Sequence, residues 1–324
     1  MAIRILSGVQ PSGKLHLGNY FGAIKNHIDL QQLPNAERFY FIADLHSLTT
    51  VQDAPALRDF VRGVAVDYLA LGLDPAQSVF FRQSDVPEVT ELAWLLATVT
   101  GMGLLERAHS FKDKTAKGIK PSVGLFYYPV LMAADILIYK SHLVPVGQDQ
   151  AQHIEMTQDM AGYFNQTYKR EVFVRPEAKL SAAPKVVGID GEKMSKSYGN
   201  TIDLQATPAQ LKKVIMSIKT DSTPVEAPKN PDQDNVFSLY ALLGTPEETA
   251  ALAAKYRAGG LGYGTAKQML LEKVTAYFAQ YREKRAQLLA QPAYVEDVLR
   301  SGAAKAREVA RQTLEEARTA CGLR

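Results

Sequence analysis

The 324-residue chain contains a single cysteine, Cys321, and this scarcity limits its chemistry. One cysteine cannot form an internal disulfide or a multi-cysteine zinc or iron–sulfur site. No apolar run reaches the roughly 20 residues that a membrane span needs. Residues 3–7 predict a strand and not the apolar core of a signal peptide. We therefore expect a cytoplasmic protein without a membrane partner.

An excess of one charge sign is also nearly absent. Lys and Arg number 37 against 34 Asp and Glu, and a net charge of +3 is only a weak indication of a nucleic-acid partner. The excess lies in residues 198–324, which hold 17 basic and 14 acidic residues and therefore suit a polyanion better than the rest. A basic cluster over residues 107–120, which includes Lys114, is either a solvated loop or a set of functional cations.

Apolar segments alternate with helical patterns over about the first 165 residues. Candidate strands are residues 3–7, 38–43, 79–82 and 143–146, with shorter ones at 172–174 and 186–189. This alternation predicts an α/β fold, a Rossmann-like domain with a parallel sheet. After Ser197 the patterns are helical, at residues 208–218, 236–243, 247–256, 263–289 and 294–320. We expect domains over residues 1–198 and 199–324, the second all-helical, with its last helix able to pack back on the first domain.

Two short segments have the composition of phosphate-binding sites. Residues 11–19, Pro-Ser-Gly-Lys-Leu-His-Leu-Gly-Asn, lie between a predicted strand and a predicted helix, where free N–H groups and the helix dipole favour an anion. Residues 193–197, Lys-Met-Ser-Lys-Ser, carry two ammonium and two hydroxyl groups beside Gly191 and Gly199. They predict a mobile loop that can close over a triphosphate. Together the two segments indicate ATP chemistry.

In this order and at this separation, the two segments resemble the signatures of class I aminoacyl-tRNA synthetases. Residues 16–19 are a variant of the HIGH signature, and residues 193–197 are identical to the KMSKS signature. Residues 124–137 and 144–155, which lie between them, are similar to the tryptophan-specific members of that class. By these ordered motifs the chain is identified as a member of the tryptophanyl-tRNA synthetases, of bacterial type.

The resemblance implies ATP-dependent attachment of L-tryptophan to tRNA(Trp). Tryptophan and ATP would form tryptophanyl-adenylate and pyrophosphate, and the acyl group would then pass to the tRNA with release of AMP. ATP would be a substrate and Mg²⁺ would arrive with it, because no carboxylate cluster marks a protein-built metal site. Residues 1–198 would be catalytic and residues 199–324 would bind the anticodon. A homodimer is implied, through the apolar helices around residues 92–105, although core packing explains those residues equally well.

The resemblance assigns the ATP site mainly to the two signature segments. The expected catalytic residues are Lys193, Lys196 and Ser195, with Lys114 as a further cation. They would stabilise charge, since the step needs no covalent nucleophile. The expected ATP-binding residues are Gln10, Pro11, Ser12, His16, Gly18, Asn19, Gly147, Gln148, Asp149, Val186, Val187, Lys193, Met194, Ser195, Lys196 and Ser197. Asp149 can alternatively be read as a helix N-cap.

Specificity for the side chain is expected to rest on Asp135. A carboxylate in an apolar helix is costly to bury unless it accepts hydrogen bonds, and the indole N–H can only donate. The alternative is a helix residue that faces solvent or a neighbouring arginine. The other expected tryptophan-binding residues are Tyr128 and Gln150 near the ammonium group, Met132, Val144 and Val146 against the indole, and His46 at the edge. His46 is as well explained as a satisfied core histidine.

Three other functions remain open from the sequence. A tyrosine-specific sister enzyme shares both signatures and needs a pocket matched to a phenol. A synthetase-like paralogue activates tryptophan for a purpose other than tRNA charging. A non-enzymatic RNA-binding or regulatory protein forms no adenylate, but it leaves the intact segment 193–197 unexplained.

Overall fold

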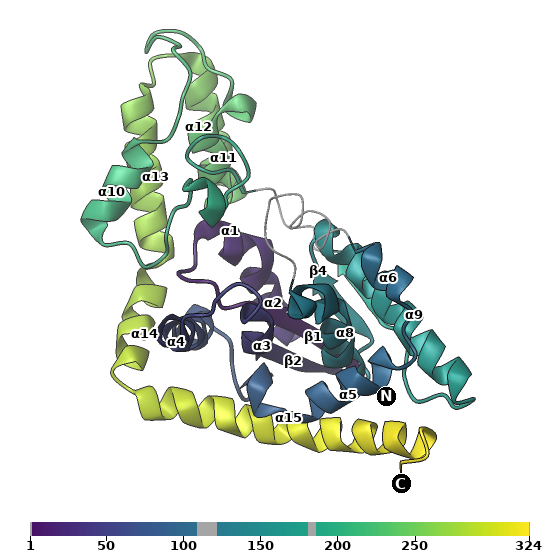
Figure 1. The fold of residues 1–324 in the computed structure, drawn as a ribbon. Coiled ribbons are helices and arrows are strands. Elements are labelled where there is room, and N and C mark those ends of the chain that lie inside the picture. The colour runs from purple at the N-terminus through teal and green to yellow at the C-terminus, as the bar shows by residue number, and fades with distance from the viewer. Residues whose placement is uncertain (1, 109–121, 181–185, 324) are drawn as a thin grey trace. The chain divides into compact units, whose positions relative to one another are not determined.

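The computed structural model describes residues 2–108, 122–180 and 186–323 (Figure 1). Contacts divide the chain into two compact units. Unit 1 contains Met1–Gly13, His27–Ser181 and Leu288–Arg324, and unit 2 contains Lys14–Asn26 and Ala182–Gln287. Because this division rests on contacts alone, the functional boundary expected at residue 198 stays a prediction. The predicted cation Lys114 lies outside the described residues.

Unit 1 is built on a five-stranded sheet in the order β3-β2-β1-β4-β5. Every neighbouring pair of strands is parallel, so the predicted α/β class is confirmed. The strands are β1 Ile3–Val9, β2 Ala36–Ile42, β3 Val79–Arg82, β4 Leu143–Val146 and β5 Glu177–Leu180. The first four lie where the alternation predicts strands.

The other two strand predictions are wrong, and β5 was not predicted. Val172 and Phe173 are buried in the hydrophobic core, but they lie in an irregular segment outside the sheet. Residues 186–189 contribute only an isolated bridge between Val187 and Lys193. The sequence of β5 is polar because its side chains are largely exposed. β3 lies at the other edge of the sheet but is covered by α15, and its sequence is apolar.

The carboxyl ends of the central strands form the edge where a sheet of this type binds ligands. β1 lies between β2 and β4, so the strand order reverses at that point, and ligands bind in the crevice outside such a reversal. The chain leaves β1 at Gln10, β2 just before Asp44, β3 at Gln83 and β4 at Gly147. The fold therefore brings four separate stretches of sequence to one edge.

Helix α8 (Val123–Leu137) runs through the core of unit 1 and contacts three other helices, α5, α6 and α9. Its first turn is capped by Ser122, whose hydroxyl accepts a hydrogen bond from Leu125 N–H at 3.1 Å. The remaining helices and 3-10 turns (η) of unit 1 are α3 Asp44–Ser47, α4 Ala54–Leu71, α5 Glu88–Ala97, α6 Met102–Glu106, α9 Ala151–Thr167, α15 Pro292–Ala320, η2 Leu30–Gln32, η3 Gln83–Asp85 and η4 Gln148–Gln150.

The last helix, α15, packs along the edge of the sheet of unit 1 (Figure 1). It contacts β3 and α5. At Gly302 the approach is so close that an added Cβ atom would lie 1.9 Å from Phe80 O. Arg307 donates hydrogen bonds to both carboxylate oxygens of Glu88 in α5, at 2.9 to 3.1 Å. The helix thus covers the open edge of β3, which would otherwise offer unpaired backbone groups.

The described part of unit 2 is mainly helical, as predicted for the C-terminal region. The predicted helix over residues 263–289 is interrupted at Phe278, so that α13 and α14 are separate. α2 Lys25–Asp29 and α14 Ala279–Leu289 contain residues of both units. The elements within unit 2 are α1 Leu17–Asn19, the π-helical turn η1 Tyr20–Ile24, η5 Lys196–Tyr198, α10 Pro208–Met216, η6 Pro231–Gln233, α11 Asn235–Ala241, α12 Pro246–Ala258 and α13 Tyr263–Tyr277.

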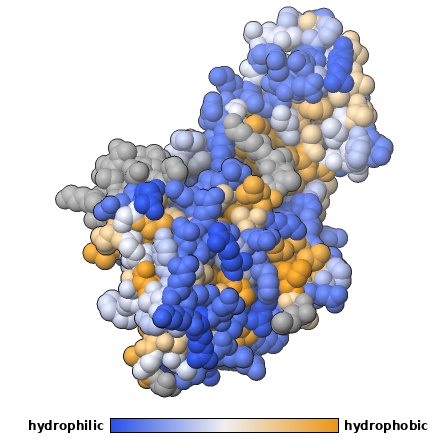
Figure 2. Space-filling view, turned by 90° about the vertical axis from the view of Figure 1, so that its right-hand side faces the viewer, coloured by the Kyte–Doolittle hydropathy of each residue, from blue (hydrophilic) through white to orange (hydrophobic). Residues whose placement is uncertain are grey.

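The surface in Figure 2 is mostly hydrophilic, with hydrophobic residues gathered in small patches. In the expected dimer region, the leucines at 92, 95, 96, 104 and 105 are buried in the hydrophobic core, so core packing explains them. Trp94, by contrast, is 68% exposed and Met102 is 63% exposed. These two side chains are therefore not accounted for by core packing within the described chain. Among the described residues, no helix is long and apolar enough to cross a membrane.

Candidate active site

Asp135 lies in the interior of unit 1 and is held by two side chains. It is 2% exposed and projects from α8. Gln83 Nε2 donates to both carboxylate oxygens at 2.8 Å, and His46 Nε2 donates to Oδ2 at 2.9 Å. The alternative that Asp135 faces solvent or an arginine is therefore wrong. We call Asp135, His46 and Gln83 the carboxylate cluster.

The pKa of Asp135 is raised above its ordinary value. Burial is the main cause, because it disfavours the ionised carboxylate, and the nearby charge of Asp44 acts in the same direction. The hydrogen bonds from His46 and Gln83 oppose this effect. The hydrogen bonds from His46 and Gln83 therefore offset part of the cost of burying the ionised carboxylate.

His46 joins this cluster to a second pair of polar side chains. Its ring lies edge-on to Tyr128, with the ring centroids 6.4 Å apart. The Tyr128 hydroxyl lies 2.6 Å from His153 Nε2, and His153 is 2% exposed. His46 is partly buried and hydrogen-bonded. The hydrogen bond agrees with the interpretation of His46 as a satisfied histidine, and its place at the edge of the tryptophan site stays a prediction.

Sequence reasoning missed Gln83, which follows β3 directly. Its Oε1 accepts hydrogen bonds from the backbone N–H groups of Leu45 and His46 at 3.1 and 3.4 Å. Gln83 thereby connects the chain after β3 to the chain after β2. The only available signal was its position at the carboxyl end of a predicted parallel strand, because a lone glutamine carries no chemical signature.

The apolar residues of the predicted tryptophan site lie in the same unit as Asp135. Met132 precedes Asp135 by three residues on α8, a spacing that places both on one face of the helix. Met132 and Val146 are partly buried against the hydrophobic core, and Val144 in β4 is 3% exposed. Gln150 is partly buried and donates to Asp149 Oδ2 at 2.9 Å.

Gly147 begins a tight turn at the end of β4. An added Cβ atom there would lie 2.8 Å from Asp149 Oδ1, so any other residue at this position would require the exposed Asp149 side chain to turn away. Gln148 and Asp149 are exposed in η4. The N-cap residue of α9 is Gln150, so the interpretation of Asp149 as the N-cap is wrong.

Gln10, Pro11 and Ser12 follow β1 on the other side of the strand reversal. Pro11 is buried, and its carbonyl accepts a hydrogen bond from the Ser47 hydroxyl at 3.2 Å. Gln10 Nε2 lies 3.5 Å from His46 O, and both Gln10 and Ser12 are exposed. The structure therefore brings the start of the first signature segment next to α3, which carries His46.

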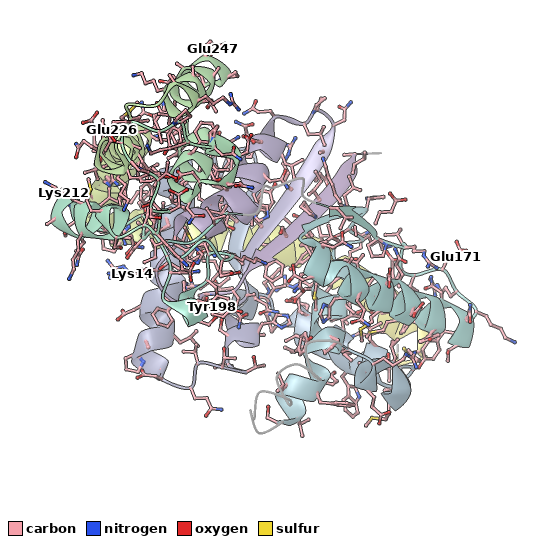
Figure 3. All side chains as sticks on the ribbon, turned by 90° about the horizontal axis from the view of Figure 1, so that it is seen from above. Lys14, Glu171, Tyr198, Lys212, Glu226 and Glu247 are labelled. Atoms are coloured by element: carbon pink, nitrogen blue, oxygen red, sulfur yellow. The ribbon has the colours of Figure 1, made fainter. Side chains whose placement is uncertain are left out.

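Unit 2 brings the rest of the first signature together with the second. Leu17 N–H donates to Ile202 O at 3.0 Å, and Leu204 N–H donates to Leu15 O at 3.0 Å. Gly18 N–H lies 3.3 Å from Met194 Sδ, and an added Cβ atom at Gly18 would lie 2.9 Å from His16 Nδ1. Residues 15–18 thus pack directly on the loop that contains residues 193–197. Lys14 and Tyr198, which flank these segments, are both exposed and are labelled in Figure 3.

His16 is a neutral side chain at physiological pH. Burial and then the positive charge of Lys196 lower its pKa to about 4. Its backbone N–H donates to Asn19 Oδ1 at 3.1 Å, which fixes the orientation of the Asn19 amide. Among the described residues, His16 Nδ1 is buried without a hydrogen-bond partner. The side chains of His16 and Asn19 are therefore neutral polar groups, and His16 lies close enough to Lys196 to be affected by its charge.

Asn200, also missed by sequence reasoning, shapes the loop of residues 193–197. It is 2% exposed, and its Oδ1 accepts from Ser195 N–H at 2.7 Å. Its Nδ2 donates to Asp190 Oδ1 at 2.9 Å and to Lys193 O at 3.2 Å. An added Cβ atom at Gly188 would lie 2.3 Å from Asn200 Nδ2, so the loop closes tightly around this amide.

The two lysines and the second serine of the loop have exposed side chains. Lys193, Lys196 and Ser197 are all exposed, and the hydroxyls of Ser195 and Ser197 are 2.8 Å apart. Val186 O accepts a hydrogen bond from Met194 N–H at 2.9 Å. Among the described residues, no group of three or more His, Cys, Asp or Glu side chains is arranged to hold a metal ion.

Comparisons with known proteins agree with one another. Residues 1–279 match the family model described as class I tRNA synthetases for tryptophan and tyrosine (W and Y). A tryptophan–tRNA ligase of Rhodopirellula baltica is 55% identical, covering 99% of this chain and all of that protein. One of Fusobacterium nucleatum is 53% identical, covering 99% and 98%. The tryptophanyl-tRNA synthetase of Campylobacter jejuni, crystallised with ADP and tryptophan, is 48% identical with a TM-score of 0.93, covering 99% and 100%.

Proposed function

This chain belongs to the tryptophan–tRNA ligases of the class I tRNA synthetase family, and we propose that it attaches L-tryptophan to tRNA(Trp) at the expense of ATP. The observation that carries the proposal is the match to tryptophan-specific relatives over nearly the whole chain. A tyrosine-specific enzyme is not favoured, because these relatives are named for tryptophan. A synthetase-like paralogue would not need the match to extend over the C-terminal helical region, and a non-enzymatic RNA-binding protein would not need the intact signature at residues 193–197.

In the first step, the tryptophan carboxylate attacks the α-phosphorus of ATP, and pyrophosphate leaves. No covalent nucleophile is needed, so the protein contributes alignment and electrostatic stabilisation. We assign the stabilising cations to Lys193 and Lys196, with Ser195 beside them and Lys114 as a third cation. Mg²⁺ arrives with the nucleotide. Support comes from the exposure of Lys193 and Lys196 on a loop that Asn200 shapes.

In the binding of tryptophan, the indole N–H donates to Asp135. Because Asp135 already accepts from His46 and Gln83, a substrate without this N–H leaves one lone pair unused and not a whole carboxylate unpaired. The discrimination assigned to this contact is therefore that of one charge-assisted hydrogen bond, about 10- to 100-fold. Tyr128 and Gln150 hold the ammonium group, and the pocket wall of Met132, Val144 and Val146 excludes water.

In the second step, the tryptophanyl group passes to the tRNA. The helical region within residues 199–324 carries the basic excess of the chain and is the proposed anticodon-binding region. We also propose a cytoplasmic homodimer that buries the exposed side chains of Trp94 and Met102.

The test is aminoacylation of tRNA(Trp) transcripts with labelled tryptophan. The proposal expects charging of tRNA(Trp) and none of tRNA(Tyr). Formation of the adenylate without any charging would support the synthetase-like paralogue in its place.

A further inference from the structure

The orientation of the Gln83 amide is fixed by its neighbours. Its Oε1 faces two backbone donors, Leu45 N–H and His46 N–H, at 3.1 and 3.4 Å. Its Nε2 faces the Asp135 carboxylate at 2.8 Å from each oxygen. The flipped amide would place a carbonyl oxygen against a carboxylate and an NH₂ group against two N–H donors, and both contacts repel. Gln83 can therefore only donate to Asp135.

The carboxylate is then left with a defined acceptor position. Oδ2 accepts from both His46 Nε2 and Gln83 Nε2. Among the described residues, Oδ1 accepts from Gln83 alone. Since a carboxylate oxygen has two lone pairs, the open acceptor position lies on Oδ1.

The turn that carries Gln83 is anchored on both sides. Ser84 N–H donates to Asp44 Oδ1 at 3.0 Å, which adds a second link between η3 and α3. Arg82 Nε donates to Asp85 Oδ2 at 2.8 Å, and its Nη1 donates to Glu296 Oε2 in α15 at 3.0 Å. Gln83 therefore has little freedom to turn away from Asp135, as a group that must hold another in place requires.

We propose that Gln83 is a positioning residue for side-chain recognition, which orients the Asp135 carboxylate so that Oδ1 receives the indole N–H of tryptophan. Gln83 itself does not touch the substrate. This inference rests on the proposed function and adds to it the residue that sets the strength of the Asp135 contact.

The decisive variant is Gln83→Glu, which keeps the shape and makes the donor conditional on a proton. When the two carboxyl groups of the variant share one proton, the new side chain can donate a hydrogen bond to Asp135, as the glutamine amide does. Without that proton, two carboxylates face each other and the donor is lost. The other charged or titratable groups around this pair are His46 and Asp44 on α3, Arg82 and Asp85 flanking Gln83, and Tyr139 after α8.

The measurement is the affinity of the full-length protein for tryptophan by calorimetry without ATP, from pH 6 to pH 8.5. We expect Gln83→Glu to bind near the wild-type affinity at pH 6 and about 10- to 100-fold more weakly at pH 8.5. Gln83→Met, which has no donor, should be weaker by a similar factor at every pH. An analogue with sulfur in place of the indole N–H, β-(3-benzothienyl)alanine, should bind all three proteins nearly alike.

Gln31→Glu is the matched control. Gln31 is also buried, and it also clamps backbone, accepting from Asp74 N–H and donating to Ile28 O and Gly72 O, but it has no carboxylate partner. This variant should follow the wild-type pH profile for tryptophan. If Gln83→Glu follows that profile too, or fails to recover at pH 6, the inference is overturned while the proposed function stands. A wild-type protein that does not bind tryptophan overturns both.

Discussion

Substitution of Gly302 by alanine should push α15 away from the edge of the sheet and loosen its packing. The new Cβ atom would lie 1.9 Å from Phe80 O and 2.7 Å from Phe80 C, whereas real Cβ contacts are essentially never shorter than 3.0 Å. Both partners are backbone atoms, so no side chain can turn aside. The helix must therefore move away from β3 by about 1.1 Å, the difference between 3.0 and 1.9 Å.

A movement of this size is costly because α15 packs through small side chains. Ala303 and Ala306 beside Gly302 are 5% and 0% exposed, and Leu299 is 2% exposed. A gap of about 1 Å loses up to about half of the dispersion energy of each contact. We expect a loss of about 3 kcal/mol in the free energy of unfolding, at the upper end for overpacked sites. For a domain of 150–250 residues this lowers Tm by about 6–12 °C.

The assay is thermal denaturation, with hydrogen exchange of the α15 and β3 amides to localise the effect. Gly63→Ala is the control, because Gly63 also lies inside a helix, α4, and an added Cβ atom there meets no described atom within 4 Å. That variant should gain about 0.5–1 kcal/mol from the better helix propensity of alanine. Equal behaviour of the two variants would refute the account of how α15 is held.

Three further predictions concern single side chains. Asp135→Asn should raise KM for tryptophan by about 10- to 100-fold in pyrophosphate exchange, with KM for ATP unchanged. Lys196→Ala should slow adenylate formation in single-turnover experiments and leave tryptophan affinity intact; a variant as fast as wild type would remove Lys196 from its role. Burial opposes ionisation of Glu88, but the hydrogen bonds from Arg307 and Arg311 outweigh this effect and lower its pKa. These ion pairs therefore stabilise the fold fully above the ordinary pKa of 4.5, and the stabilisation disappears as the pH falls through the lower pKa of the folded state. Glu88→Gln should cost about 1–2 kcal/mol at pH 7 in urea denaturation and flatten this acid dependence, and an unchanged curve would contradict this role of the ion pairs.

Periodicity predicted the parts of the fold whose burial determines their sequence. β1 to β4 are buried strands, and their apolar runs are visible without any tertiary information. The periodicity did not predict β5, because its side chains are largely exposed and its sequence is therefore polar. The strand predicted at Val172 and Phe173 is absent because these apolar residues are buried in an irregular segment and not in the sheet. An apolar run in the sequence indicates a buried segment, and it indicates a strand only where the buried segment is also part of the sheet.

The candidate site shows a similar limit. Asp135 stands out in the sequence because a carboxylate within an apolar helix needs a reason. Gln83 and Asn200 do not stand out, because amides occur in many contexts and their importance comes from the partners that the fold supplies. The role of a residue that holds another in place is set by tertiary contacts between distant segments, here between residues 83 and 135, which no local pattern encodes.

The central claim is that this chain activates tryptophan, and amino-acid-dependent ATP–pyrophosphate exchange without tRNA tests it most directly. The assay should include all twenty amino acids, with Mg²⁺ present. The account predicts exchange with tryptophan alone. Exchange with tyrosine would contradict the assignment of the pocket, and the absence of exchange from a folded protein would contradict the proposed enzymatic function altogether.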